Sequence, residues 1–206
     1  SLLRLPFRHY CVAEAIETHS AMVGYQVLGY YMDAVCTVPY DFGNWIIKDT
    51  TVYVKKGDAF YISAAALETF GKSDAVSTLE LQEDGSTRIT GTGDTYVYKE
   101  GLANINVENQ TLEMRVKTNN VTGISMYCHG TYIKDGTEGS TPWFTGDFWA
   151  HVVDTGEVDS EGYSIYTLDF SNIQGASWKT LTGFRIGSYN TSELTLDVKE
   201  IKVINQ

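Results

Sequence analysis

The feature that most constrains the fold is a regular succession of short strand-like segments and turn signals that begins at Ser77. The segments are rich in β-branched and aromatic residues, and Gly, Asn and Asp residues separate them at intervals of about 8–12 residues. This pattern predicts a two-sheet β-sandwich about 130 residues long. The predicted strands are 78–81, 87–91, 111–117, 124–128, 148–153, 164–170, 182–186 and 194–203, with turns at 83–85, 119–120, 135–136, 154–156 and 189–190.

The first part of the chain has a different pattern, in which helix and strand signals alternate. Pro6 followed by an apolar stripe predicts a helix over 6–20. Ser63 as N-cap predicts a second helix over 64–70 that stops at Gly71. The change of pattern predicts a mainly β chain of two domains, a small α/β unit over 1–73 and the β-sandwich over 74–206. Between the two helices we expect strands at 23–27 and 31–38 around a turn at 29, a loop at 39–43, a strand pair within 46–54 turning at 48–50, and a turn at 55–58.

The charge balance excludes several classes of partner. The chain has 15 Lys and Arg against 26 Asp and Glu, a net charge of −11 with a pI near 4.7. A surface of this sign repels phosphate backbones, and the longest basic run is Lys55-Lys56, so we exclude nucleic acid. The apolar runs are too short for a membrane-spanning helix, so we expect no membrane insertion. The first six residues lack the pattern of a signal peptide, and we interpret the chain as a fragment or a processed form.

Cysteine and glycine patterns exclude further classes of site. Cys11, Cys36 and Cys128 form no C-x-x-C spacing, which excludes zinc-ribbon and thioredoxin-type sites. Cys11 and Cys36 could pair, but we prefer three buried thiols that act as small apolar residues. We find neither a Ser/His/Asp constellation nor a glycine-rich phosphate loop followed by a helix.

The first unit carries a set of motifs found together in one known domain: Leu5-Pro6-Phe7-Arg8, Ala13-Glu14-Ala15, Val52-Tyr53-Val54, Tyr61-Ile62-Ser63 and Ala66-Leu67-Glu68-Thr69-Phe70-Gly71. With these motifs it resembles the stalk-like domain found at the N-termini of some copper amine oxidases and repeated in many secreted bacterial surface proteins. The resemblance implies a spacer or wall-associated element and no copper site. His9 and His19 are ten residues apart, which does not place two ligands on one helix face, so we assign no metal there.

The second unit carries several motifs of one known kind of module: Asp84-Gly85-Ser86, the segment 112–117, Trp178, Thr182-Gly183-Phe184-Arg185-Ile186 and Leu196-Asp197-Val198. With these motifs it resembles a jelly-roll carbohydrate-binding module of the kind appended to bacterial polysaccharide-degrading enzymes. The resemblance implies a jelly-roll sandwich that is a non-catalytic module with polysaccharide as its partner, located outside the cell or on the cell surface, and we expect a monomer. Gly187-Ser188 stands where such modules usually have Asp-Pro.

Sugar binding requires flat apolar surfaces for pyranose rings and planar polar groups for hydroxyls, and the chain has 14 Tyr, 8 Phe and 4 Trp. The densest aromatic cluster is 143–149. Neighbouring residues of a strand face opposite sides, so one of Phe148 and Trp149 belongs to the core. We expect Trp178 to be a core residue as well. The predicted ligand-binding residues are Trp143, Tyr132, Tyr96, Tyr98, Phe148 and Asp147.

A structural calcium ion is a second implication of the resemblance. Such modules bind calcium through one carboxylate near the first strand and another on the last strand, and calcium prefers oxygen ligands. Asp197 matches the last-strand position, and Glu80 or Glu83 could supply the other carboxylate. The alternative is that each of these carboxylates is simply a solvated surface group.

A catalytic alternative rests on Glu157-Val158-Asp159-Ser160-Glu161, which resembles the carboxylate strand of some jelly-roll glucanases. For a retaining hydrolase, the carboxyl groups of Glu157 and Glu161 would lie about 5–5.5 Å apart in a cleft. The small and flexible residues between and beside these carboxylates instead favour a solvated hairpin turn. The remaining alternative to sugar binding is a structural or adhesive spacer without a sugar site.

Overall fold

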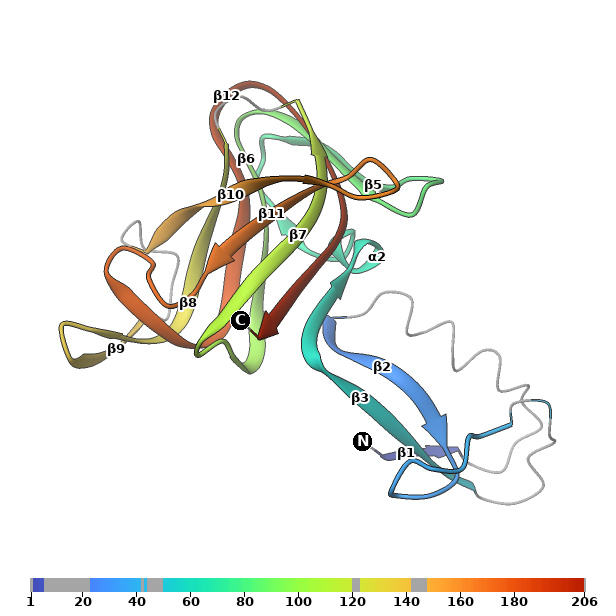
Figure 1. Cartoon of the computed structure of the whole chain (residues 1–206). Helices are drawn as coiled ribbons and strands as arrows, with labels where there is room; N and C mark the ends of the chain where they lie inside the picture. The colour runs from blue at the N-terminus through green and yellow to red at the C-terminus, as the bar shows by residue number, and fades with distance from the viewer. Residues whose placement is uncertain are drawn as a thin grey trace.

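The computed structural model describes residues 2–5, 23–41, 43, 50–119, 123–141 and 148–205. Most of these residues lie in antiparallel strands, which confirms the predicted mainly β fold. Twelve strands form one continuous sheet that folds over on itself into two layers (Figure 1). The strands are β1 (Leu2–Leu5), β2 (Val23–Tyr31), β3 (Thr50–Ser63), β4 (Gly71–Lys72), β5 (Val76–Leu81), β6 (Thr87–Asn106), β7 (Gln110–Thr118), β8 (Ile124–Lys134), β9 (Thr137–Thr141), β10 (Trp149–Val158), β11 (Ser164–Asp169) and β12 (Ala176–Asn205), with a single described helix, α2 (Ala64–Leu67).

Two long strands join the layers. The first part of β12, residues 176–188, pairs with β8 and with the second half of β6. Its last part, residues 194–205, pairs with β7, with the end of β3 and with the first residues of β6. The predicted strands 182–186 and 194–203 are therefore one strand, and the predicted turn at 189–190 lies inside it, where the register with β6 shifts. A bulge keeps the backbone paired through this bend, so turn-forming residues here do not end the strand.

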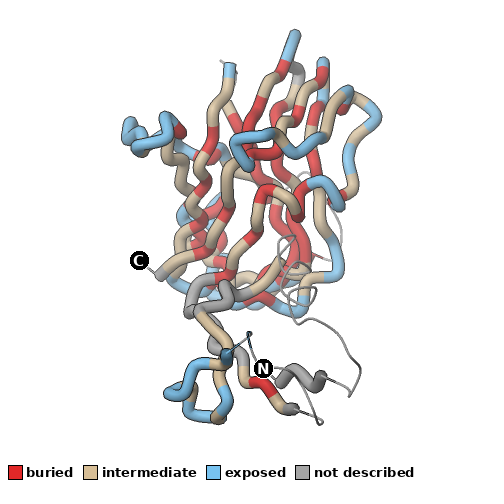
Figure 2. Tube along the Cα trace, turned by 90° about the vertical axis from the view of Figure 1, so that its right-hand side faces the viewer, coloured by how far each residue is buried: buried red, intermediate tan, exposed pale blue. Residues whose placement is uncertain are grey.

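The core lies between the layers and follows the two-residue period of the strands. Leu112, Met114 and Val116 alternate along β7 and are almost completely buried. Met126 of β8 and Phe184 of β12 face them from the other layer. Figure 2 shows buried positions alternating with partly exposed ones along the strands of the sandwich. Trp178 has no exposed surface, as we expected from the sequence.

The first part of the chain differs from the sequence prediction in three places. Gly29 lies within β2, which continues to Tyr31, so no turn separates two strands there. Residues 32–38 form a loop, because the carboxylate of Asp33 accepts hydrogen bonds from the backbone N–H groups of Thr37 and Val38. The predicted turn at 55–58 lies inside β3. The predicted helix over 6–20 and residues 44–49 lie outside the described residues.

The second predicted helix is present and short. The hydroxyl of Ser63 accepts a hydrogen bond from the Ala66 N–H at 3.2 Å, which confirms Ser63 as the N-cap of α2. Turn-type bonds from Thr69 N–H and Phe70 N–H to the carbonyls three residues before end the helix early. Gly71 then begins β4.

Residues 60–72 belong to the sandwich by their contacts. The end of β3 pairs with β12, and Leu67 and Phe70 are buried in the main core. The ring of Phe70 meets the ring of Phe184 edge-on, with 5.9 Å between centroids. The division at residues 73 and 74 stays a prediction.

Among the thiols, Cys128 is buried, Cys36 is half-buried and free, and Cys11 lies outside the described residues.

Candidate functional site

The register of four neighbouring strands places a row of large side chains on the outer side of the first layer. Arg185 of β12 stands between Tyr98 of β6 and Tyr127 of β8, and Tyr127 in turn pairs with Trp149 of β10. All four side chains are partly exposed. Strands lie about 4.8 Å apart, so the row extends about 15 Å across the sheet.

A second row lies two residues further along the same strands. Tyr96 of β6 pairs with Gly187 of β12, which pairs with Ser125 of β8, and Ser125 pairs with His151 of β10. The Ser125 hydroxyl and His151 Nδ1 are 3.2 Å apart, which orients the exposed imidazole. Tyr189, two residues beyond Gly187, lies on the same side of β12.

Ring contacts join the two rows into one surface. Tyr189 stacks on Tyr96 at 5.8 Å and contacts Tyr127 at 5.2 Å between centroids. Tyr127 stacks with Trp149 at 6.3 Å, and Trp149 meets His151 edge-on at 5.1 Å. We call this surface the aromatic face, and it comprises Tyr96, Tyr98, Tyr127, Trp149, His151, Arg185 and Tyr189.

Arg185 places a positive charge in the middle of the aromatic face. Its guanidinium carbon lies 4.2 Å from the centre of the Tyr96 ring and 5.7 Å from that of Tyr127. Burial, and to a smaller extent the charge of Arg185, lower the pKa of His129 on β8 to about 4. Burial raises the pKa of Tyr189, although Arg185 acts in the opposite direction. Near neutral pH, His129 and Tyr189 are therefore neutral, and Arg185 carries a charge among them.

Glycines on β12 keep the strands close beneath this surface. A Cβ atom at Gly187 would lie 2.1 Å from the carbonyl oxygen of Thr95, so no larger residue fits without moving β6. Gly71 of β4 has a related role, since the ring of Tyr98 lies across it and a Cβ there would lie 2.2 Å from Tyr98 Cζ. The ring of Tyr98, beside Arg185, therefore lies against the backbone of β4.

The sequence predicted only part of the aromatic face. Tyr96 and Tyr98 belong to it and lie 6.4 Å apart between ring centroids. Phe148 was placed wrongly, because it is only 8% exposed and its ring packs edge-on against Trp178 at 5.7 Å. Its neighbour Trp149 has the exposed position instead. Trp143 and Asp147 lie outside the described residues.

Sequence reasoning missed the other five members of the face, which are Tyr127, Trp149, His151, Arg185 and Tyr189. A signal for Tyr127 existed, since it stands at an alternate position in a strand whose other side is apolar. Tyr132, the remaining predicted ligand-binding residue, points to the opposite side of β8. It packs against Phe148 and Trp178.

The predicted calcium ligands do not fit a calcium ion. Asp197 is 8% exposed and accepts hydrogen bonds from Arg88 Nε at 2.7 Å and Arg88 Nη2 at 2.8 Å. Arg88 of β6 is in register with Glu80 of β5 on one side and with Asp197 of β12 on the other. The Arg88 guanidinium already supplies the positive charge that a cation would bring to Asp197. Among the described residues, no group of three or more His, Cys, Asp or Glu side chains is arranged to hold a metal ion.

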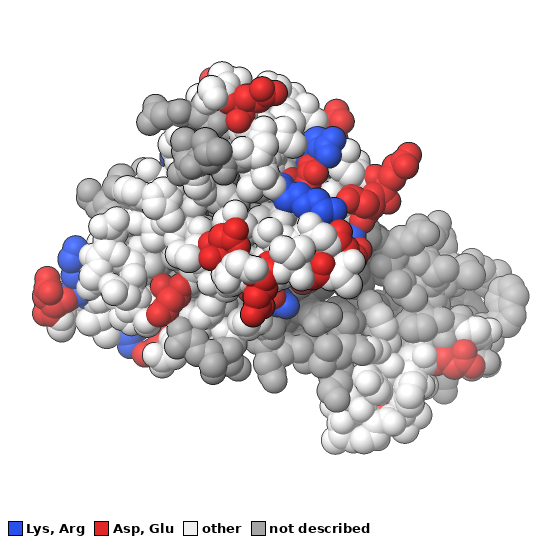
Figure 3. All heavy atoms as spheres, turned by 45° about the horizontal axis from the view of Figure 1, so that its top comes forward, with Lys and Arg blue, Asp and Glu red and all other residues white. Residues whose placement is uncertain are grey.

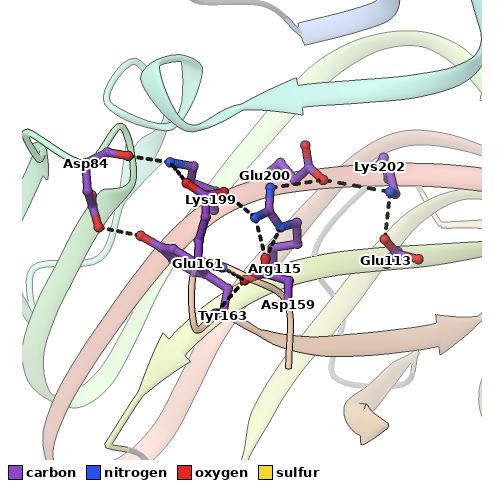
Figure 4. Close-up of polar contacts among 9 residues, drawn as sticks. All are labelled: Asp84, Glu113, Arg115, Asp159, Glu161, Tyr163, Lys199, Glu200 and Lys202. Atoms are coloured by element: carbon purple, nitrogen blue, oxygen red, sulfur yellow. Dashed lines mark hydrogen bonds and ion pairs between the residues drawn. The ribbon is translucent and has the colours of Figure 1, made fainter. Parts of the chain in front are cut away.

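The acidic segment 157–161 covers the end of β10 and the turn that follows it, and ion pairs stabilise this turn (Figure 4). The Asp159 carboxylate accepts hydrogen bonds from the N–H groups of Glu161 at 2.8 Å and Tyr163 at 3.0 Å. Arg115 of β7 pairs with both Asp159 and Glu161, and Lys199 of β12 also pairs with Glu161 at 3.2 Å. This confirms the interpretation of the segment as a hairpin turn.

The pKa directions in this turn do not suit acid catalysis. Burial acts to raise the pKa of Asp159, but the Tyr163 N–H and Arg115 outweigh it, and the net direction is down. The Arg115 and Lys199 hydrogen bonds lower the pKa of Glu161. A glycosidase acid needs a raised pKa instead. Figure 3 shows the wider pattern on one side of the molecule, where acidic side chains outnumber basic ones and the basic ones lie next to acidic ones.

Comparison with known proteins gives structural neighbours only. No family model matches the chain, and no curated protein matches it. The low-affinity xylan-binding module CBM86 from Roseburia intestinalis is similar in structure with a TM-score of 0.40 and 13% identity, over 73% of this chain and 97% of that one. The xylan-binding module CBM15 is similar with a TM-score of 0.40 and 12% identity, over 70% and 94% of the two chains. A family 6 carbohydrate-binding module from Clostridium cellulolyticum, in complex with xylose, is similar with a TM-score of 0.39 and 14% identity, over 70% and 96%.

Among the described residues, no helix is both long and apolar enough to cross a membrane.

Proposed function

We propose that this chain is a non-catalytic polysaccharide-binding part of a larger secreted or cell-surface bacterial protein, and that it binds glycan as a monomer on the aromatic face. The observation that carries the proposal is the continuous surface of rings contributed by β6, β8, β10 and β12, with Arg185 at its centre.

The size of the aromatic face suits an extended chain of sugars. The row from Tyr98 to Trp149 spans about 15 Å at the strand spacing of about 4.8 Å. A sugar chain that runs across the strands can place the apolar faces of successive rings on Tyr98, Tyr127 and Trp149. The rings are rigid because they pack on one another, so binding costs little side-chain entropy.

The polar groups of the aromatic face suit hydroxyl groups. The Arg185 guanidinium offers several N–H donors in one plane, and its contact with the Tyr96 ring limits its rotation. The His151 imidazole and the phenol groups of the exposed tyrosines can each donate or accept a hydrogen bond. These groups supply the directional contacts that orient a sugar on an apolar surface.

The acidic segment gives no support to the hydrolase alternative. Asp159 and Glu161 are held by Arg115 and by the backbone of their own turn. The spacer alternative predicts a surface without a ligand, and it does not account for the seven contacting side chains of the aromatic face.

The test is a pull-down of the purified chain with cellulose, xylan, mannan and β-glucan, with released reducing sugar measured in the same tubes. We expect retention on at least one polysaccharide without release. Full burial of an aromatic side chain contributes about 1.5–3 kcal/mol, so Tyr127→Ala and Trp149→Ala should each weaken binding about tenfold or more.

Tyr31→Ala is the matched control, since it truncates a partly exposed tyrosine on β2, outside the aromatic face. Its retention should equal that of the unmodified chain. Release of reducing sugar would contradict the non-catalytic assignment. Absence of retention on all four polysaccharides would favour the spacer alternative.

A further inference from the structure

The ring of Tyr98 lies flat over the neighbouring strand β4, at one end of the aromatic face. Gly71 of β4 is in register with Tyr98, and directly paired residues of antiparallel strands have their side chains on the same side of the sheet. A Cβ atom at Gly71 would lie 2.2 Å from Cζ, 2.4 Å from Cε2 and 2.7 Å from Cε1 of Tyr98. These three ring carbons are nearer to it than the hydroxyl oxygen at the edge of the ring. The face of the ring therefore covers Gly71.

The ring, rather than the backbone, requires a glycine at position 71. The φ angle of Gly71 is not positive, so an alanine can adopt the same backbone conformation. The atoms that a methyl group would meet are carbons at the far end of the Tyr98 side chain. An alanine at position 71 therefore displaces the ring and leaves the strand pairing in place. A glycine inside a strand is typical of a place that another group approaches closely.

The backbone beneath the ring is fixed on both sides of Gly71. Phe70, the residue before it, is buried in the main core. On the other side, the Ser73 N–H donates to the Tyr96 carbonyl at 3.0 Å, and the Ser73 hydroxyl donates to the Asp94 carbonyl at 2.7 Å. The same hydroxyl accepts a hydrogen bond from the Tyr96 N–H at 3.3 Å. The orientation of the ring is thus set before any ligand arrives, which lowers the entropy cost of binding.

The flat ring extends the first row of the aromatic face by one strand. Tyr98 is partly exposed, and since Gly71 lies under one face of its ring, the other face is turned away from the sheet. At a strand spacing of about 4.8 Å, five neighbouring strands span about 19 Å. The row in register across β4, β6, β12, β8 and β10 is Gly71, Tyr98, Arg185, Tyr127 and Trp149.

We propose that Gly71 is a positioning residue for the glycan site, and that the Tyr98 ring lying over it forms an end subsite for the last pyranose ring of a bound chain. The flat ring offers the apolar face on which the C–H side of a sugar packs. A ring pushed away from the sheet by a side chain at position 71 would no longer lie in line with the rest of the row. This inference rests on the proposed function, because it names one end of the same binding surface.

The experiment is isothermal titration calorimetry of the full chain with β-1,4-linked oligosaccharides of xylose, glucose and mannose, each with two to six units. We expect the affinity for at least one series to rise with chain length until the row is filled. Gly71→Ala should weaken the affinity for the hexasaccharide about fivefold and remove the gain that comes from the last sugar unit. Tyr98→Ala should remove the same gain.

Two further variants separate positioning from a structural role. Gly71→Ala combined with Tyr98→Ala should bind as tightly as Tyr98→Ala alone, because no ring remains for the methyl group to displace. Gly139→Ala is the matched control, since Gly139 of β9 is in register with Tyr132 and a Cβ there would lie 2.6 Å from Tyr132 Cζ. The Tyr132 ring packs in the core, so this variant should lower the Tm and leave the affinity unchanged.

The outcomes distinguish this inference from the proposed function. If the unmodified chain and Gly71→Ala bound the oligosaccharides equally, the positioning role would be overturned and the proposed function would stand. The same holds if Gly71→Ala weakened binding by an equal factor with and without the Tyr98 ring, or if Gly139→Ala weakened it as much. An unmodified chain that binds none of the oligosaccharides would contradict the proposed function and this inference together.

Discussion

The buried imidazole of His129 makes the stability of this protein depend on pH in a defined window. His129 is 2% exposed and stands on β8, next to Gly183 of β12 in register, with Glu100 on the far side of that glycine. Burial, followed by the charge of Arg185, lowers its pKa to about 4, against about 6.5 in an unfolded chain. The unfolded chain therefore binds a proton more readily than the folded one.

The direction and size of the effect follow from this difference. Stability is unchanged well above pH 6.5 and falls as the pH drops from about 6.5 towards about 4, because protonation favours the unfolded state. Each unit of difference between the pKa of His129 in the folded and unfolded chains corresponds to about 1.4 kcal/mol, so the full loss in unfolding free energy is about 3 kcal/mol. Between pH 7 and pH 4.5 the loss amounts to about 2 kcal/mol, or about 4–8 °C in Tm for a chain of this size.

The assay is urea unfolding at several pH values between 7 and 4.5, followed by tryptophan fluorescence. The His129→Gln variant should lose the decline in unfolding free energy over this window. His151→Gln removes an exposed imidazole on the same side of the sheet and should retain the decline. If the unmodified chain and His129→Gln showed the same pH dependence, the assignment of a neutral, buried His129 would be refuted.

Four further predictions concern the contacts that stabilise the sandwich. Tyr163→Phe removes the 2.6 Å hydrogen bond that lowers the pKa of Asp84, so the variant should be about 1 kcal/mol less stable at neutral pH in urea unfolding, and the gap should close as the pH falls below about 4. Arg115→Met removes the cation that pairs with Asp159, Glu161 and Glu200, and it should lower the unfolding free energy by about 2 kcal/mol, with part of the loss recovered at high salt. Gly187→Ala places a Cβ against the β6 backbone and should cost about 1–3 kcal/mol in unfolding free energy and also weaken polysaccharide retention. Chelation with EDTA should leave the Tm unchanged, because Asp197 already has a guanidinium partner, and a fall reversed by added calcium would contradict this.

The sequence by itself determined those features that depend on neighbours along the chain. The short β-rich segments predicted the mainly β fold, and Ser63 predicted the start of α2. The two-residue period of a strand placed Tyr96 and Tyr98 on the same side. The same period showed that Phe148 and Trp149 face opposite sides, although it could not tell which of the two is buried.

Only the tertiary structure decided how the strands are placed against one another. The register of β6, β8 and β12 puts Arg185 between Tyr98 and Tyr127, although these residues are far apart along the chain. The bulges that keep β12 paired through its bend depend on the twist of the whole sheet, so the turn predicted at 189–190 is not a chain reversal. Asp197 likewise has its partner 109 residues away on β6. Pairing across strands depends on which layers pack together, and that free energy belongs to the assembled core rather than to any one segment.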